Sequence, residues 1–297
     1  MTTCERVSSY VTRIQTNGTR CIGVPSVGFV SFVPGHVFDV LIGLPLPDYR
    51  LALSVGLVLG LSLAVLRGRR RGLTVLAVVD GALAAAVGGL LGGRLVYVAT
   101  QWGYFHDHLG SALAVWQGGL SAPGALIGGV GGVLAFSTVR QRDPRPLLDA
   151  LVPSAALIAA CAWIGCLKAG CSCGVEAQPG QGLLWSLSAE LPDLYGLRVP
   201  RVAVQALGAA WNLAVVAAVL LVGRRRAFPL WLLLHASGDF ALAFLRGDLG
   251  GYGMLGDHGG SPLQVADLAL ALIGLLLLAL PWWDHARPPM SSETSGA

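Results

Sequence analysis

Two ionisable side chains in one apolar stretch of this 297-residue chain have the spacing needed for joint proton transfer. His235 and Asp239 are four residues apart, so on a helix they lie on one face and can form a pair. A carboxylate beside an imidazole orients the ring and stabilises its protonated form, which suits general acid–base catalysis. A buried pair that only fixes helix packing is an equally good interpretation. His235 and Asp239 are therefore the candidate catalytic residues.

Arginines near the ends of two apolar stretches are candidates for binding an anion. Arg94 lies in GGRLVYV, and Arg246 lies in FLRGD. The planar guanidinium group can bind an anion through paired hydrogen bonds, and an ionisable residue in an apolar span is a functional candidate by default. The alternative is that each side chain extends to a membrane interface and anchors the end of its helix.

Four cysteines lie close together in CAWIGCLKAGCSCG: Cys161, Cys166, Cys171 and Cys173. Their spacing is not the CxxC of a redox or zinc site, and no nearby histidine completes a ligand set, so we expect no metal and no cofactor. A disulfide or plain packing is the main expectation for this group. Cys166, Cys171 and Cys173 form a possible thiol cluster, in which Cys171 or Cys173 would be the nucleophile.

The composition indicates what positions these residues. Hydrophobic residues make up 54% of the chain and charged residues only 12%, whereas a soluble domain has about 25% charge. The fold class is therefore an all-α polytopic membrane protein. Seven stretches approach the ~20 residues that cross a bilayer. They are 49–66, 73–99, 119–139, 149–169, 201–222, 228–245 and 264–283.

Arginine clusters predict the orientation of these spans. RGRRR (67–71), RQRDPR (140–145) and GRRR (223–226) follow the first, third and fifth spans, so all three lie on one side of the membrane. The positive-inside rule makes that side the cytoplasm, with the N-terminus outside and the C-terminus cytoplasmic. We expect the clusters to set topology and not to bind nucleic acid. Asp80 and Asp149, near cytoplasmic span starts, are expected to cap helices.

One membrane domain accounts for most of the chain. We expect a polar, poorly ordered N-terminal segment at 1–40, a single seven-helix membrane domain at 41–284, and a short cytoplasmic tail at 285–297. The first segment lacks the charged start and apolar core of a secretory signal.

A glycine-rich stretch, WQGGLSAPGALIGG (116–129), combines two signals. Gly124 and Gly128 are four residues apart, as are Gly88 and Gly92, and such small-residue pairs let transmembrane helices approach closely. The turn ahead of the helix has exposed amides that suit an anion such as a lipid phosphate. An ordinary interfacial loop with a tryptophan anchor is the alternative.

In order and spacing, several of these stretches resemble the prolipoprotein diacylglyceryl transferase family. FDVLIGLPLPDYRLALSVGLVLG, GGRLVYV, WQGGLSAPGALIGG and FLRGD carry the resemblance, which runs from about Phe38 to Leu280. The substrate-binding residues that the resemblance implies are Tyr49, Arg94, Trp116, Gly118, Gly119, Gly124 and Arg246.

The resemblance also implies an activity. The family moves a diacylglyceryl group from phosphatidylglycerol to the thiol of a lipobox cysteine in a preprotein, and glycerol-1-phosphate leaves. The implied partners are phosphatidylglycerol or a related anionic phospholipid, the preprotein and the bilayer. The implied location is the bacterial plasma (inner) membrane, as a multi-pass protein.

The chain departs from the family pattern at several polar positions. Pro123 stands in place of a histidine, Trp163 in place of an arginine, and Asp239 in place of an arginine. Other replacements of polar family residues are Cys166, Cys171, Val204, Gln205 and His235. Two hypotheses remain: an active, divergent transferase, and a catalytically altered or inactive homologue that binds lipid or lipoprotein.

Overall fold

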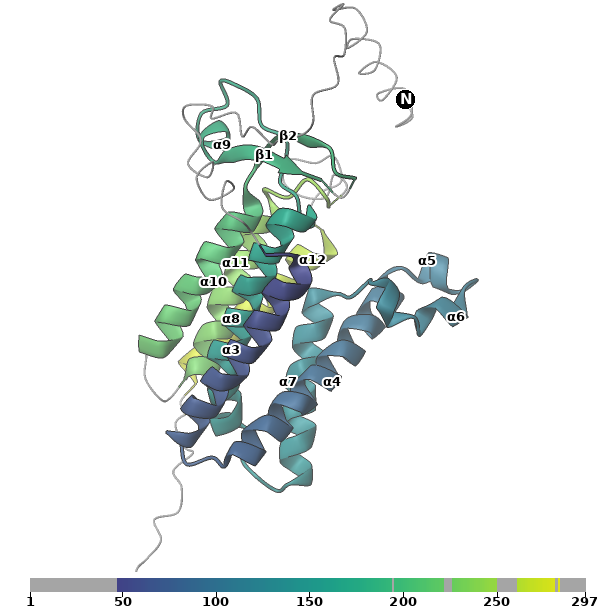
Figure 1. The fold of residues 1–297 in the computed structure, drawn as a ribbon. Coiled ribbons are helices and arrows are strands. Elements are labelled where there is room, and N and C mark those ends of the chain that lie inside the picture. The colour runs from purple at the N-terminus through teal and green to yellow at the C-terminus, as the bar shows by residue number, and fades with distance from the viewer. Residues whose placement is uncertain (1–46, 194, 222–225, 250–260, 281–282, 284–297) are drawn as a thin grey trace, which may run out of the picture. The chain divides into compact units, whose positions relative to one another are not determined.

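Seven apolar helices form the membrane part of the computed structural model, which confirms the predicted fold class (Figure 1). Six are long and apolar enough to cross a membrane, and α11 is a shorter apolar helix of 17 residues. The helices are α3 (Tyr49–Arg69), α4 (Val75–Thr100), α7 (Ala122–Val139), α8 (Arg145–Ala169), α10 (Val204–Leu221), α11 (Ala227–Ala243) and α12 (Pro262–Ala279).

The structure describes residues 47–193, 195–221, 226–249, 261–280 and 283, all within one compact unit, Val33–Ala297. The predicted segments 1–40 and 285–297 lie outside the described residues, as does most of the GRRR cluster.

Local sequence signals account for where several helices begin. The hydroxyls of Thr74 and Ser121 accept hydrogen bonds from backbone N–H groups in the first turns of α4 and α7. Ser261 and Gln264 form a reciprocal capping box at the start of α12. Pro123 lies in the first turn of α7, where a missing N–H costs nothing.

Glycines bring α4 and α7 into backbone contact, as the small-residue spacing predicts. A Cβ atom on Gly92 would lie 2.7 Å from the Cα of Gly128. A Cβ on Gly88 would collide with the carbonyl oxygen of Gly128, and one on Gly132 would collide with that of Ala84. Without side chains at these positions the two helices pack as a close pair.

Glycines also shape the contact between α3 and α8. A Cβ on Gly56 would lie 2.7 Å from the Cβ of Cys161. One turn away, the hydroxyl of Ser154 donates a 2.6 Å hydrogen bond to the carbonyl oxygen of Gly60. The interhelical hydrogen bond and the close packing both stabilise this pair within a membrane.

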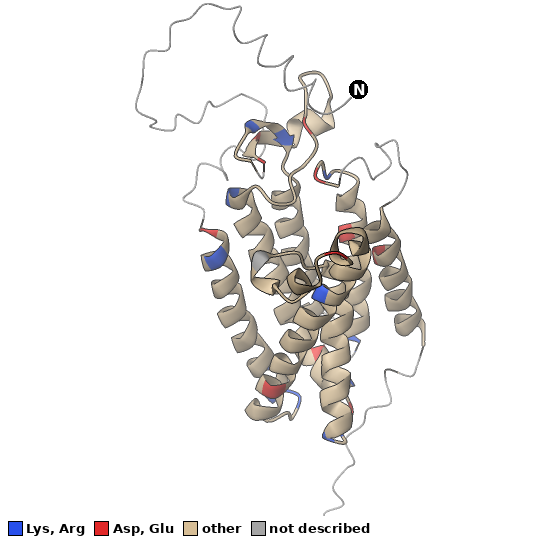
Figure 2. Ribbon diagram, turned by 90° about the vertical axis from the view of Figure 1, so that its right-hand side faces the viewer, with Lys and Arg blue, Asp and Glu red and all other residues tan. Residues whose placement is uncertain are grey.

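Charged groups join the helices at one end, which we call the basic end. Arg71 lies 3.0 Å from Asp149, linking the end of α3 to the start of α8. Arg67 donates to the carbonyl oxygen of Val219 at the end of α10, and Arg226 to that of Leu278 at the end of α12. The described basic residues of all three arginine clusters therefore lie at one end of the helices, as expected if successive helices cross the membrane in alternate directions. That this end faces the cytoplasm stays a prediction. Figure 2 shows charged residues concentrated toward the helix ends.

Neither predicted capping carboxylate caps its own helix. Thr74 occupies the cap position of α4, and α8 begins at Arg145, well before Asp149. Asp149 instead accepts a 2.8 Å hydrogen bond from the N–H of Phe228 and so caps the start of α11. Asp80 pairs with Arg140 at 3.4 Å. The correction arises because Pro144 and Pro146 start α8 earlier than the hydropathy alone indicated.

A β-hairpin covers the opposite end of α8 and α10, and we call that end of the helices the hairpin end (Figure 1). Strands β1 (Ser188–Pro192) and β2 (Arg198–Val202) pair antiparallel, following the short helix α9 (Leu183–Ser186). Asp193 holds the turn by accepting from the N–H groups of Tyr195 and Leu197. The sequence prediction contained no strands, because this hairpin is short and lies in a stretch interpreted as an outer loop.

Three short helical turns connect α4 to α7: α5 (Trp102–Phe105), α6 (Leu109–Ala112) and the 3-10 turn η1 (Val115–Gln117).

Candidate active site

The two predicted catalytic residues lie together on α11 and continue into a polar chain. The Nε2 atom of His235 is 3.7 Å from Oδ2 of Asp239, and its Nδ1 atom is 3.2 Å from Oδ1 of Asn212 on α10. The imidazole stacks on the ring of Trp231 at 5.3 Å between ring centres. Contacts on both nitrogens and on one face therefore hold the ring in a single orientation.

The hydrogen bonds of Asn212 determine which nitrogen of His235 carries a proton. The Nδ2 group of Asn212 donates to the carbonyl oxygen of Gly208 at 2.9 Å, so Oδ1 is the atom turned toward the imidazole. An oxygen accepts, and therefore Nδ1 of His235 must donate. In the neutral imidazole the lone pair then lies on Nε2, which faces the carboxylate of Asp239. That arrangement lets Nε2 take up a proton.

A second carboxylate, Asp267 on α12, belongs to this neighbourhood. Its charge interacts with those of Asp239 and Arg246. The Oδ1 atom of Asp239 is buried and makes no hydrogen bond to the described part of the chain. Sequence reasoning missed Asp267, although a carboxylate within an apolar span is by itself a signal of function.

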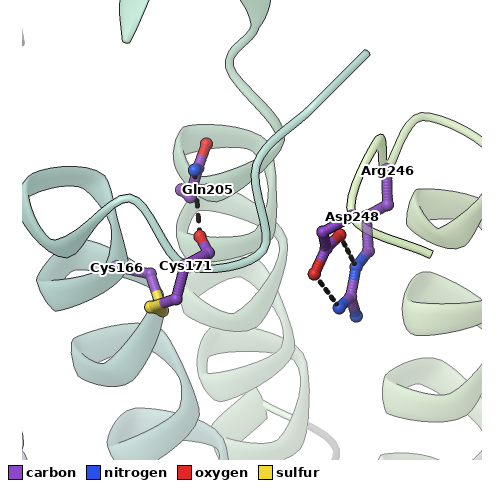
Figure 3. Close-up of a disulfide and its surroundings, with 5 residues drawn as sticks. All are labelled: Cys166, Cys171, Gln205, Arg246 and Asp248. Atoms are coloured by element: carbon purple, nitrogen blue, oxygen red, sulfur yellow. Dashed lines mark hydrogen bonds and ion pairs between the residues drawn. A yellow bond between two sulfur atoms is a disulfide. The ribbon is translucent and has the colours of Figure 1, made fainter. Parts of the chain in front are cut away.

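Arg246 follows α11 and is held by backbone pairing. It forms an isolated antiparallel bridge with Gly174, and the N–H of Gly247 donates to the carbonyl oxygen of Cys173 at 2.8 Å. Its guanidinium group donates to both oxygens of Asp248, from Nε at 2.9 Å and from Nη2 at 2.8 Å (Figure 3). The Nη1 group makes no hydrogen bond to the residues that the structure describes.

The electrostatics keep Arg246 charged. Burial lowers the pKa of this guanidinium, but the hydrogen bonds and charge of Asp248 outweigh that effect, and the pKa lies above its ordinary value. One edge of the guanidinium group thus faces a carboxylate while Nη1 still has two N–H donors to offer.

Arg94 has a different set of partners. Its five N–H groups point to backbone carbonyl oxygens of the loop before α7, at 2.6–3.4 Å. These oxygens belong to Ser111, Ala112, Ala114, Gly118 and Gly119. The rings of Tyr97 and Phe105 flank the guanidinium carbon at 5.6 and 5.4 Å. Because backbone carbonyls take up its N–H donors, Arg94 holds this loop in the structure, and its role in binding a lipid phosphate stays a prediction.

The remaining predicted substrate-binding residues have structural contacts of their own. Gly118 and Gly119 adopt positive φ angles of 86° and 77°, which glycine adopts without steric strain. Gly124 packs against Gly92, and Tyr49 packs against Gly165 of α8. The indole of Trp116 is 80% exposed, as expected for an interfacial anchor. No hydrogen bond or ring contact in the described structure joins these residues to the His235–Asp239 pair.

The four cysteines that the structure describes divide into a disulfide and two thiols. Cys166, in the last turn of α8, is bonded to Cys171, so Cys171 has no free thiol and the prediction of Cys171 as a nucleophile is wrong for this form. Cys161 and Cys173 are free. Burial and then the nearby charge of Asp248 raise the pKa of the Cys173 thiol, which keeps it protonated and weakly nucleophilic.

Comparison with known proteins assigns the family. The model of the prolipoprotein diacylglyceryl transferase family matches residues 36–280. The chain belongs to the prolipoprotein diacylglyceryl transferase family.

Relatives support this family over most of their length. A phosphatidylglycerol–prolipoprotein diacylglyceryl transferase 2 of Clostridium perfringens is 26% identical over 251 residues, which is 82% of this chain and 93% of that protein. The corresponding transferase of Clostridium tetani is also 26% identical, over 80% of this chain and 94% of its own length. A shorter match to the Bacillus licheniformis transferase has 38% identity over 106 residues, covering 36% of this chain and 39% of that protein.

Apolar packing fills positions where the family resemblance leads us to expect polar groups. The ring of Trp163 fits against Gly208, where a Cβ atom would lie 2.5 Å from Cδ2 of the indole. Pro123 is buried in the first turn of α7. Gln205 is fully buried, and its Nε2 donates to the carbonyl oxygen of Cys171 at 3.0 Å. Within the described residues, Asp239 on α11 and Arg246 just after it both keep hydrogen-bonding groups unused, and Gln205 on α10 and Gln264 on α12 each keep one buried side-chain atom without a partner.

Proposed function

We propose that this family member transfers a diacylglyceryl group from phosphatidylglycerol to the thiol of a lipobox cysteine in a preprotein. The relatives at 26% identity over most of the chain bear the name of this activity. The observation that carries the proposal is the chain Asn212–His235–Asp239, which leads toward Arg246. We place the reaction at the bacterial plasma membrane, with the hairpin end on its outer side.

The reaction joins sulfur to the glycerol carbon that bears the phosphate oxygen of the lipid. A carbon–sulfur bond forms, the carbon–oxygen bond breaks, and glycerol-1-phosphate leaves with that oxygen and its electron pair. The thiol proton must leave sulfur, because the thiolate is the nucleophile. The protein therefore has to accept one proton and stabilise one departing anion.

His235 is the proposed proton acceptor. Its Nδ1–H is held by Oδ1 of Asn212, so its lone pair lies on Nε2. When Nε2 takes the thiol proton, the carboxylate of Asp239 at 3.7 Å stabilises the imidazolium. The pair thus does work that the resemblance assigned to other residues, since α7 offers Pro123 where a histidine was expected.

Arg246 is the proposed phosphate ligand. Asp248 holds one edge of its guanidinium group, which leaves the Nη1 donors directed elsewhere. A fixed cation stabilises the negative charge that develops on the leaving phosphate, and hydrogen bonds to charged groups are the stronger kind.

Complementation with a chemical readout tests the proposal. The protein is produced in a bacterium depleted of its own transferase, and a lipobox substrate is examined by mass spectrometry. We expect the mass of a diacylglyceryl group on the lipobox cysteine, and far less of it with a His235→Phe variant made at equal level. If the inserted, folded wild-type protein leaves the substrate unmodified, the protein is instead a lipid- or lipoprotein-binding homologue, for which Trp163 and Pro123 at polar family positions already argue.

A further inference from the structure

The disulfide closes a short turn that follows α8. Cys166 and Cys171 are five residues apart, and Gly170 between them ends the helix in the left-handed region with a φ of 71°. Ser172, the next residue, also has a positive φ, of 51°. A residue with a side chain seldom adopts this conformation unless the surrounding structure holds it. The turn is therefore one that needs a restraint.

After this turn the chain becomes the middle strand of a small ladder. On one side, the N–H of Val202 donates to the carbonyl oxygen of Val175 at 3.0 Å. On the other side, the N–H of Val175 donates to Leu245 at 2.9 Å and the N–H of Gly247 donates to Cys173 at 2.8 Å. These last two bonds lie immediately before and after Arg246. The backbone of Arg246 is thus held by the strand that the disulfide starts.

Gln205 restrains the same turn from α10. Its side chain is fully buried, and its Nε2 donates to the carbonyl oxygen of Cys171 (Figure 3). The approach of the strands is close, because a Cβ on Gly247 would lie 2.9 Å from the carbonyl oxygen of Gly174. Small shifts of the turn are therefore transmitted directly to the backbone around Arg246.

We infer that the Cys166–Cys171 disulfide, with Gln205, positions Arg246 for the lipid phosphate, so that affinity for phosphatidylglycerol depends on this bond. The inference rests on the proposed function of Arg246. In the resulting view, Cys166, Cys171 and Gln205 are positioning residues that do not contact the substrate.

Reduction has a defined and local consequence. A phosphine such as TCEP breaks the S–S bond and leaves two thiols together with the phosphine oxide, whose oxygen comes from water. The turn at Gly170 and Ser172 then relaxes, and the hydrogen bonds of Val175 and Gly247 open more often. Because the closed loop is short, its loss leaves the seven helices folded.

Hydrogen–deuterium exchange tests the positioning without any substrate. Peptides that cover 171–177 and 244–249 are compared in the oxidised wild type, the TCEP-treated wild type and a Cys166→Ser/Cys171→Ser double variant. We expect exchange at both peptides to become about tenfold faster when the bond is absent, while α4 and α7 stay protected. Cys161→Ser, a free cysteine of the same helix, is the matched control and should match wild type. Unchanged exchange in the two peptides overturns the inference.

Kinetics tests the consequence for the lipid. In nanodiscs of varied phosphatidylglycerol content in phosphatidylcholine, we expect the double variant to raise KM for phosphatidylglycerol about tenfold and to keep kcat within about twofold. TCEP should reproduce this in wild type and add nothing to the double variant. Gln205→Leu should raise KM in the same direction. A merely structural role would instead lower the amount of folded enzyme, and therefore apparent kcat, with KM unchanged, and that result contradicts the inference.

The two proposals fail in different ways. If transfer is complete and KM for phosphatidylglycerol is the same with and without the disulfide, the positioning role is overturned but the proposed transferase activity stands. An oxidised wild-type protein that makes no thioether from phosphatidylglycerol overturns the proposed function, and the claim about lipid affinity falls with it.

Discussion

The α4/α7 pair and the group formed by α10, α11 and α12 are both apolar helices with buried polar groups, yet they use those groups differently. In the α4/α7 pair, glycines bring the backbones together, and five carbonyl oxygens satisfy Arg94. In the second group, Asp239 keeps a buried oxygen without a partner in the described chain, and Nη1 of Arg246 is likewise unused there. In the first region the N–H groups of the buried arginine all have partners within the protein. In the second region, hydrogen-bonding groups remain available for a substrate.

Arg94 and Arg246 illustrate this difference. Both lie near the end of an apolar helix, and both fit the family resemblance as phosphate ligands. The two arginines differ in their hydrogen-bond partners. Backbone carbonyl groups accept all five N–H groups of Arg94, so this side chain holds the loop before α7 in place. Within a membrane an arginine is costly and therefore a sign of function, but only its partner atoms show whether that function is structural or chemical.

The largest expected effect on stability lies in the α4/α7 pair. A Gly128→Ala substitution would place a methyl group against the backbone of Gly88 and Gly92, so we expect it to destabilise the folded protein by about 2–3 kcal/mol. Thermal unfolding in detergent measures the change. Gly131→Ala on the same helix, where a Cβ meets nothing within 4 Å, is the control and should be neutral or slightly stabilising. Equal behaviour of the two variants would show that the close contact does not hold the pair together.

The next effect concerns chemistry alone. We expect His235→Phe and Asp239→Asn each to lower the transfer rate, by about 10²–10³-fold for His235→Phe, with little change in unfolding temperature. Since the carboxylate acts through the imidazole, the double variant should lose little more than His235→Phe does. Rates of the four proteins in a double-mutant cycle measure the coupling. Losses that multiply would mean that the two residues act separately.

The smallest effect is a surface ion pair at the hairpin end. Lys168, by its hydrogen bond and its charge, lowers the pKa of Asp48 below its ordinary 3.8, so the pair stabilises the folded state when the carboxylate is ionised. That contribution is lost as the pH falls through the lowered pKa. Both side chains are largely exposed, at 54% and 76%, which keeps the contribution small.

Unfolding temperatures of wild type and Asp48→Asn at about pH 7 and about pH 3 check this sign. The small advantage of wild type should be present at the higher pH and shrink at the lower one. An advantage that grows on acidification would contradict the assignment.

Much of the fold follows from local pattern. Hydropathy alone located the seven helices, because a bilayer requires about 20 apolar residues per span whatever the tertiary contacts are. The spacing of Gly88 with Gly92 and of Gly124 with Gly128 predicted that each helix can approach a neighbour closely, and the spacing of His235 and Asp239 predicted their contact. Each of these depends on residues within one or two helical turns.

The remaining features depend on partners that are distant in sequence. The carbonyl groups that bind Arg94 lie 17 to 25 residues away, and the N–H that Asp149 caps is 79 residues away. The bridge between Gly174 and Arg246 joins a segment that precedes α10 in the sequence to one that follows α11. Hydropathy carries no information about such pairings, which is why neither the loop contacts of Arg94 nor the β-hairpin could be predicted from it.

A direct comparison of Arg246→Gln with Arg94→Gln tests the central claim that the lipid phosphate is bound by the segment after α11 and not by Arg94. KM for phosphatidylglycerol and the unfolding temperature are measured for both variants. Arg246→Gln should raise KM by about tenfold or more at an unchanged unfolding temperature, since it removes a charge-assisted phosphate contact. Arg94→Gln should lower the unfolding temperature, because it frees the loop before α7. The opposite pattern, in which Arg94→Gln raises KM in a fully stable protein and Arg246→Gln leaves KM unchanged, would contradict the account.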